Sequence, residues 1–269
     1  NDLTSGVENT MVGSLAGDAL NTGARNVAIG AYSLSSEDTG NYSVAIGHNS
    51  LYAQNIDGDA YNTAVGYSAG LNVTTGIQNT IIGGLAGDAL TTGANNTALG
   101  YAALSTEDTG SRSVAIGNFA LFSQNNDSNN DNTAVGYNAG FALTTGINNT
   151  LIGALAGDAL TTGSTNVAIG YNALSAQQTN GQNVAVGAQA LQNQNVSGHG
   201  NNTAIGLQAG LNITTGIKNT IIGSSAGDAL TEGQNNIMIG FGSAASAVDV
   251  NNEITLGDGN ISSIRCQVQ

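Results

Sequence analysis

The stretch Asn62-Thr63-Ala64-Val65-Gly66 decides the fold of this chain, because the same five-residue pattern recurs fifteen times between residues 9 and 257. The motifs begin 17, 17, 19 and 17 residues apart, and this set of steps repeats, so the chain has a second period of 70 residues. A repeat this short cannot bury a hydrophobic face by itself, and stacked coils must bury it together. The sequence therefore predicts an all-β parallel β-roll, or β-solenoid, of about fifteen coils.

The repeat also sets the expected domain boundaries. We expect a leading segment over residues 1–8, the repeat array over residues 9–257, and a C-terminal capping segment over residues 258–269 that leads into a further domain. Because the chain opens at Asn1 with repeat-like sequence, we interpret it as a piece of a longer protein. Apolar residues make up 40% of the chain and occupy fixed repeat positions, which favours an ordered stack over disorder.

The charge of the chain argues against several partners. The net charge is −14 and only four residues are Lys or Arg, whereas a phosphate backbone is held by clustered Lys and Arg, so we expect no nucleic-acid partner. No apolar run approaches the ~20 residues of a membrane span, so we expect no membrane insertion. Cys266 is the only cysteine, which excludes an intrachain disulfide, and we expect it to be a small buried residue.

Numbering each coil from the first motif residue separates its positions by chemistry. Position two is Thr, Val or Ile, and position four is aliphatic in every coil. Side chains alternate across a strand, so these two positions share one face, and β-branched residues suit it. We predict that this face lines the inside of the coil. The predicted coil-core residues at position four are Val65, Ile82, Leu99, Ile116, Val135, Ile152, Ile169, Val186, Ile205 and Ile222.

Position three points the other way and is also apolar, being Ala in nine coils and Met, Ile or Leu in five. A strand that is apolar on both faces is buried on both, and monomers rarely expose a continuous apolar column. Small side chains favour close approach by a copy of the same chain, and closed cyclic symmetry is the usual arrangement. We therefore predict a homotrimer. The candidate trimer-interface residues are Ala28, Ala45, Ala64, Ile81, Ala98, Ala115, Ala134, Leu151, Ala168, Ala185, Ala204 and Ile221.

Two further features of the coil lead to predictions. Position eight is Ala or Ser in fourteen coils, and we expect a second short strand to begin there. Position one is Asn in twelve coils, and we expect these amides to form hydrogen bonds up and down the array.

Every fourth coil carries two extra residues, in segments 54–61, 124–131 and 194–201. Insertions in a solenoid emerge on one face, often the binding face. The three segments differ from one another, which fits either tolerance of surface change or tuning for a ligand. Tyrosines that follow the motif glycine form aromatic rows, which could stack on sugars or pack at corners. The receptor-contact candidates are Asp57, Asp59, Tyr61, Asp127, Asp131, His199, Tyr67, Tyr101, Tyr137 and Tyr171.

Two stretches carry a family resemblance. Ser43-Val44-Ala45-Ile46-Gly47 and Ser113-Val114-Ala115-Ile116-Gly117 match the Ser-Val-Ala-Ile-Gly signature of the heads of trimeric autotransporter adhesins, which this chain resembles over about fourteen coils. The resemblance implies a left-handed parallel β-roll assembled as an intertwined homotrimer. The coils here are longer than those typical of such heads.

Other stretches look more like bacteriophage fibre shafts. They are the Asn-Thr-Ala-Val-Gly-Tyr variant at residues 62–67 and 132–137, and the ending over residues 252–268. In those fibres a similar ending precedes a self-cleaving intramolecular chaperone that drives trimerisation. The resemblance implies a segment of a tail fibre that trimerises in this way.

The sequence offers few groups for catalysis or metal binding. His48 and His199 stand in different coils without a repeated Cys or acidic partner. Gly-Asp pairs recur once per 70 residues, so at a ~4.8 Å rise per coil their carboxylates lie roughly 19 Å apart, too far to share one ion. Those aspartates are Asp18, Asp88, Asp158 and Asp228. We predict no metal site and no cofactor.

Two alternative functions remain open at this point. A glycan-cleaving tailspike needs paired carboxylates in a groove, for which the chain offers Glu37-Asp38 and Glu107-Asp108, but the third set reads Ala176-Gln177-Gln178. The Thr-Thr-Gly corners suggest an ice-binding face, although only one Thr of each pair could contribute to it.

The interpretation that we favour is a structural segment of a homotrimeric bacteriophage tail fibre, not an enzyme. It would attach to a host surface by reach and avidity, with a host glycan or protein as partner, and would belong to the virion. The alternative within the same class is the head of a bacterial trimeric adhesin at the cell surface.

Overall fold

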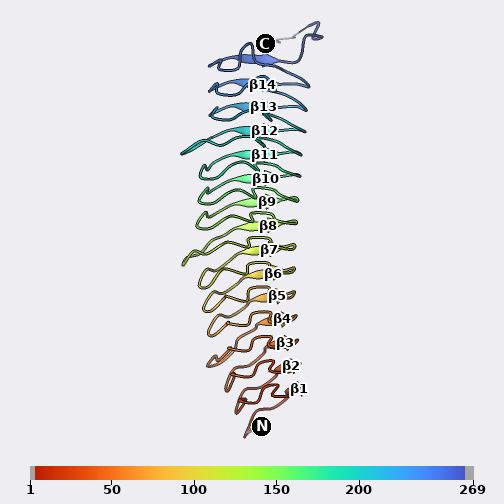
Figure 1. The fold of residues 1–269 in the computed structure, drawn as a ribbon, viewed down its shortest axis with the longest axis vertical. Coiled ribbons are helices and arrows are strands. Elements are labelled where there is room, and N and C mark those ends of the chain that lie inside the picture. Colours follow the sequence, from red (N-terminus) through yellow and green to blue (C-terminus); the bar gives the residue numbers. More distant parts are fainter. Residues whose placement is uncertain (1–3, 264–269) are drawn as a thin grey trace, which may run out of the picture.

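The structure is a computed structural model that describes residues 4–263, and its fifteen strands stack in sequence order into one parallel sheet along a rod (Figure 1). The predicted β-solenoid of about fifteen coils is confirmed. Cys266 and the end of the predicted capping segment lie outside the described residues. The strands are β1 (Thr10–Val12), β2 (Val27–Ile29), β3 (Val44–Ile46), β4 (Thr63–Val65), β5 (Thr80–Ile82), β6 (Thr97–Leu99), β7 (Val114–Ile116), β8 (Thr133–Val135), β9 (Thr150–Ile152), β10 (Val167–Ile169), β11 (Val184–Val186), β12 (Thr203–Ile205), β13 (Thr220–Ile222), β14 (Ile237–Ile239) and β15 (Ile254–Leu256).

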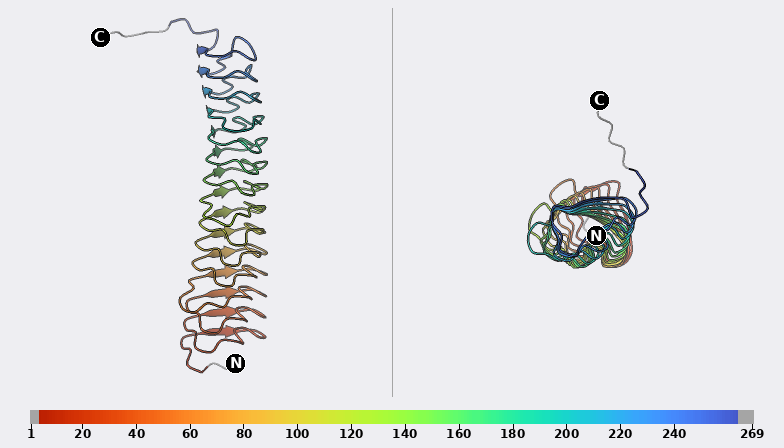
Figure 2. Two further views of the ribbon diagram at one scale, coloured as in Figure 1. Left: turned by 90° about the vertical axis from the view of Figure 1, so that its left-hand side faces the viewer. Right: turned by 90° about the horizontal axis from the view of Figure 1, so that it is seen from above.

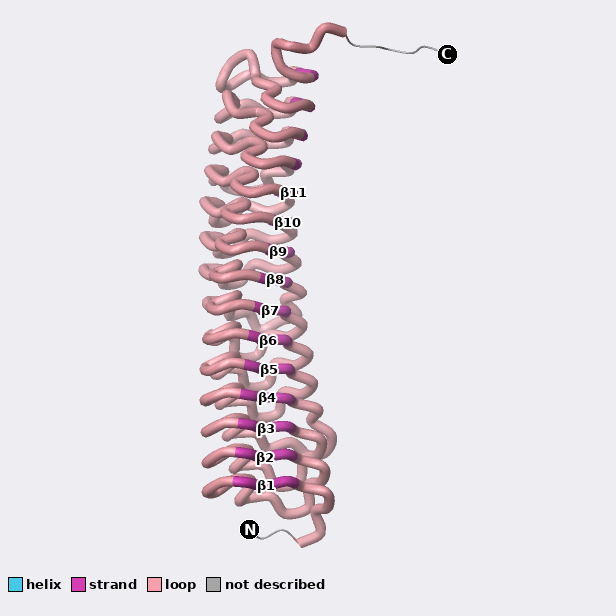
Figure 3. Tube along the Cα trace, turned by 90° about the vertical axis from the view of Figure 1, so that its right-hand side faces the viewer, coloured by secondary structure: helices cyan, strands magenta, loops and turns pink. Residues whose placement is uncertain are grey.

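Each coil contributes one strand, and all strands lie on the same side of the rod (Figures 2 and 3). The register is constant, so equal positions of neighbouring coils pair, as Ala64 does with Ile81. Because the register never slips, every side chain of one position forms a column along the rod.

The orientation of the strands is opposite to the prediction from the sequence. Position three is fully buried inside the coil from β2 to β14, whereas positions two and four are half-buried or exposed on the outside. A side chain with no exposed surface cannot contact a second chain, so position three is not an interface between chains. This corrects the assignment of Ala28, Ala45, Ala64, Ile81, Ala98, Ala115, Ala134, Leu151, Ala168, Ala185, Ala204 and Ile221. The residues predicted as coil core lie instead on the outer face: Val65, Ile82, Leu99, Ile116, Val135, Ile152, Ile169, Val186, Ile205 and Ile222.

The small residues at position three reflect the narrow interior of each coil. Ala168 shares its coil with the fully buried Leu174 at position nine, whereas Leu151 shares its coil with Gly157 at that position. A Cβ added to Gly157 would lie 2.8 Å from Cδ2 of Leu151, closer than real side chains approach. In these coils, positions three and nine together hold only one large side chain, so alanine fits the coil itself and not a neighbouring chain.

The asparagines at position one form a buried ladder along the interior. The Oδ1 atom of Asn62 accepts a hydrogen bond from the backbone N–H of Asn79 at 2.9 Å, and its Nδ2 donates to the carbonyl of Gly76 at 2.7 Å. The expected amide hydrogen bonds along the array are thus confirmed, with the backbone of the next coil as partner of Oδ1 and the backbone of the same coil as partner of Nδ2. They satisfy polar backbone groups that would otherwise be buried without a partner.

The second half of the coil turns without forming the strand expected from position eight. Ala69 lies between Ser68 and Gly70, whose φ angles are 51° and 60°, so the backbone of residues 68–70 is not extended. The coils still bond to each other here, because the N–H of Leu51 donates to the carbonyl of Ala69 at 3.0 Å. The prediction of a second strand was wrong within residues 4–263, although the bonding between coils that it implied is present.

The closing glycine of the motif is required by the stacking. Gly66 has a φ of 142°, and a Cβ at this position would lie 2.5 Å from the carbonyl oxygen of Gly83 in the next coil. Only glycine permits both this backbone angle and this approach.

Candidate functional site

The outer sheet face, defined as positions two and four of β1–β15, is distinguished by its residue types. Its residues are Thr, Val, Ile and Leu, and none is charged, although the chain contains 22 charged residues. Many of its aliphatic side chains remain well exposed, including Leu99 and Ile205, both at 40%. The face runs the length of the rod, along the magenta strands of Figure 3. The prediction of an exposed apolar column at position three was wrong, because that position is buried; positions two and four form the exposed column instead.

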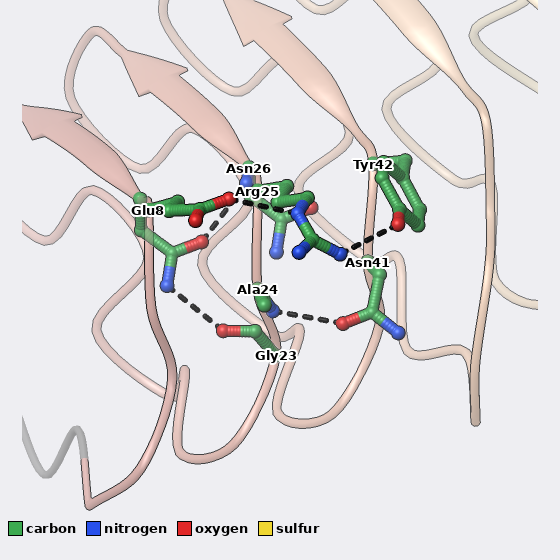
Figure 4. A network of polar contacts seen from close by, with 8 residues as sticks. Glu8, Gly23, Ala24, Arg25, Asn26, Asn41 and Tyr42 are labelled. Carbon is green, nitrogen blue, oxygen red and sulfur yellow. Dashed lines mark hydrogen bonds and ion pairs between the residues drawn. The ribbon is translucent and has the colours of Figure 1, made fainter.

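A polar column borders this face at the residue before each motif. At the start of the rod, Arg25 pairs with Glu8 at 2.8 Å and donates to the hydroxyl of Tyr42 at 2.6 Å (Figure 4). The hydrogen bonds to Glu8 and to Tyr42 raise the pKa of Arg25. Tyr42 stacks on Tyr61 with ring centroids 5.1 Å apart, and the hydroxyl of Tyr61 donates to Asp59, which raises the pKa of Tyr61. The column links four successive coils.

All Lys and Arg residues within residues 4–263 occupy this border position. They are Arg25, Arg112 and Lys218. Arg112 pairs with Asp131 at 2.9 Å, and Lys218 lines a polar pocket of about 490 Å³ with glutamine and asparagine side chains of the coils that follow. The basic residues of the described chain thus lie along the edge of the outer sheet face, and no charged residue lies on the face itself.

Exposed tyrosines border the opposite edge of the outer sheet face. Tyr67, Tyr101, Tyr137 and Tyr171 are exposed by 59%, 48%, 54% and 53%. They occur in alternate coils, about 10 Å apart, so they are separate exposed rings and do not form a continuous row. Tyr67 stacks on His48 of the preceding coil, with centroids 5.7 Å apart and planes 10° apart.

An aromatic groove, defined by Tyr32, His48, Asn49, Tyr52 and Leu71, lies next to Tyr67; it is open to solvent and has a volume of about 280 Å³. Sequence reasoning did not select Tyr32 or Tyr52. The signal that could have found them is the clustering of tyrosine, because five of the eight tyrosines fall between residues 32 and 67.

The receptor-contact candidates in the inserted segments lie at the surface. Their carboxylates bond to the preceding coil: Asp57 accepts from Thr39 at 3.0 Å, and Asp127 accepts from Thr109 at 2.8 Å. His199 is exposed and belongs to a segment that pairs with Gly181. The exposed candidates of these segments are Asp57, Asp59, Tyr61, Asp127, Asp131 and His199.

The carboxylates considered for glycan cleavage do not face solvent as pairs. Glu107 is fully buried, and it accepts hydrogen bonds from the backbone of Gly110 at 2.8 Å and from the side chains of Gln124 and Asn130 at 2.9 and 3.0 Å. Glu37 is equally buried and bonds to Gly40 in the same way. These glutamates hold the inserted segments to the coil, and a polysaccharide cannot reach them.

Within residues 4–263, no three His, Cys, Asp or Glu side chains are arranged to hold a metal ion. One of the Gly-Asp carboxylates, Asp88, accepts a hydrogen bond from Ser105 of the next coil instead. The described part of the chain has no helix long and apolar enough to cross a membrane.

Comparison with known proteins identifies no family for this chain. No protein-family model matches it, and no curated protein matches it.

Proposed function

We propose that this chain is a structural segment of a homotrimeric attachment fibre, of the kind found in bacteriophage tails. The observation that carries the proposal is the outer sheet face, an uncharged apolar surface on the full length of the rod. The same face would serve a bacterial trimeric adhesin, so the two related roles share one assembly.

The size of the face favours burial between chains. Fifteen coils at a ~4.8 Å rise and strands about 10 Å long give roughly 700 Å² per chain. Monomers rarely expose an apolar patch of more than about 300–600 Å², whereas a standard interface buries about 800 Å² per partner. The face therefore matches an interface in area as well as in chemistry.

Cyclic symmetry about an axis parallel to the rods suits the function of an attachment fibre. It places the first coils of all chains at one end and the last coils at the other, so that one end can be anchored while the other meets the host. The polar border columns of Arg25, Arg112 and Lys218 would then lie at the rims of the contact, where charges are normally found. Three chains would present every exposed loop three times, which strengthens weak binding through avidity.

The test is the mass of the purified protein in solution, measured by analytical ultracentrifugation. We expect three times the mass of one chain. Ile152→Lys places a charge in the middle of the outer sheet face and should shift the protein toward monomers. Thr162→Lys, at an exposed corner outside the sheet, is the matched control and should remain trimeric.

A monomeric wild-type rod that stays folded would overturn the proposal. A trimer that Ile152→Lys leaves intact would show that another surface holds the chains together, and would reject the outer sheet face as the interface.

A further inference from the structure

The aromatic groove is a hollow outside the outer sheet face that is lined mainly by rings. Tyr32 and Tyr52 remain 39% and 41% exposed, so a ligand in solution can reach both side chains. The groove is close to the lower limit of volumes seen for ligand pockets, about 300 Å³, which suits one small ring better than a buried polymer.

The planes of the aromatic rings that line this groove are inclined to one another. Tyr32 meets Tyr52 at 65° with centroids 6.4 Å apart, and it meets His48 at 75° with centroids 6.0 Å apart. Neither His48 nor Tyr52 is therefore stacked parallel on Tyr32. The hydroxyls of the tyrosines, the imidazole of His48 and the amide of Asn49 supply hydrogen-bonding groups around these apolar walls.

The other 70-residue sets show that the fold does not need these aromatic residues. In the third set, Gln192 occupies the position of Tyr52 and Asn172 that of Tyr32, in coils with the same strand pairing. In the second set Ala102 occupies the position of Tyr32 and Phe122 that of Tyr52, and Phe122 stacks at 5.2 Å on Phe141, which occupies the position of Leu71. Neither the second nor the third set therefore carries tyrosine at both positions, and the pair Tyr32 and Tyr52 is particular to the first set.

The chemistry of the lining determines the class of ligand. No Asp, Glu, Lys or Arg lines the groove, and the chain as a whole carries a net charge of −14. An anionic ligand would meet no cation here and would be repelled by the rod. A pyranose ring has an apolar face of C–H groups that packs on an aromatic ring, and its hydroxyls need partners of the kind that Tyr, His and Asn provide.

We propose that the groove formed by Tyr32, His48, Asn49, Tyr52 and Leu71 binds a neutral sugar residue of a surface glycan. This inference deepens the proposed attachment function and rests on it for its biological purpose. In a trimer the groove would occur three times, so weak binding at each copy would still hold a glycan-covered surface.

The experiment is saturation-transfer NMR on the full chain with defined sugars as probes. The probes are the methyl glycosides of glucose, galactose, mannose and N-acetylglucosamine, with glucuronic acid and sialic acid as anionic comparators. We expect transfer to at least one neutral glycoside and none to the acids. The double variant Tyr32→Asn/Tyr52→Gln, which copies the third set, should weaken that binding at least tenfold.

The matched control is Tyr171→Ala, because position 31 of the first set is already alanine and Tyr171 is 53% exposed. It should bind the sugar as the wild type does. The inference would be overturned if no neutral glycoside bound at millimolar concentration. It would also be overturned if Tyr171→Ala lost as much sugar binding as the double variant, or if the two acids bound as well as the neutral glycosides.

Sedimentation of the same samples separates this inference from the proposed function. A trimeric rod that binds no sugar rejects the groove alone. A monomeric rod whose sugar binding depends on Tyr32 and Tyr52 rejects the fibre and leaves the groove standing.

Discussion

Replacing Asn149 with alanine tests the buried ladder that joins the coils. Asn149 is fully buried, its Oδ1 accepts from the backbone N–H of Asn166 at 3.0 Å, and its Nδ2 donates to the carbonyl of Gly163 at 2.9 Å. It also donates to Oδ1 of Asn132 in the preceding coil at 3.2 Å. Oδ1 of Asn149 also accepts from Nδ2 of Asn166 at 3.2 Å, and the variant Asn149→Ala removes all four contacts at the centre of the array.

The expected loss of stability follows from the polar groups that the substitution leaves without a hydrogen-bond partner. The N–H of Asn166 and the carbonyl of Gly163 would remain buried without a partner, and each such group costs about 1–3 kcal/mol. We therefore expect the free energy of unfolding to fall by about 2–6 kcal/mol. In a repeat array the loss acts first between neighbouring coils, so local opening near residues 149–166 should increase most.

Urea unfolding at a fixed protein concentration and hydrogen exchange of the Asn166 amide provide the measurement. Asn193→Ala is the control, because this exposed residue occupies the position that Ala53 holds in the first set. It should change stability by less than about 0.5 kcal/mol. A loss that small in Asn149→Ala, with unchanged exchange at Asn166, would refute the ladder as a source of stability.

Two further predictions concern the interior and its charges. Gly157→Ala should cost about 1–3 kcal/mol, because the new Cβ would lie 2.8 Å from both Leu151 and Leu160. Adding Leu151→Ala should recover part of that loss in urea unfolding, and strictly additive losses would contradict the packing argument. Burial raises the pKa of Asp158, whose Oδ1 is buried without a hydrogen-bond partner in the described chain. A raised folded-state pKa gives stability that is full below the unfolded pKa and is lost as pH rises through the folded value. Asp158→Asn should therefore melt at a higher temperature than wild type at pH 7 and lose this advantage near pH 3; an advantage that grows on acidification would contradict the sign.

The sequence alone was sufficient for the architecture. The spacing of motifs such as Asn62–Gly66 predicted stacked coils and their approximate number, because a short repeat has no other way to bury its apolar positions. It also predicted the role of the asparagines at position one, since a polar residue that recurs in every coil needs partners along the stack.

Only the tertiary structure decided which face of each strand lies inside. Both faces are apolar, so alternation along Thr63-Ala64-Val65 is equally consistent with either orientation. The choice depends on the opposite wall of the coil, where Leu174 fills the space beside Ala168 and Gly157 leaves space for Leu151. The aromatic groove likewise depends on coils meeting at a corner, because Tyr32, His48 and Tyr52 come together only when successive coils are stacked in register. The cross-section of the folded coil determines which side chains pack together in its interior. The order of residues along one strand does not specify this packing.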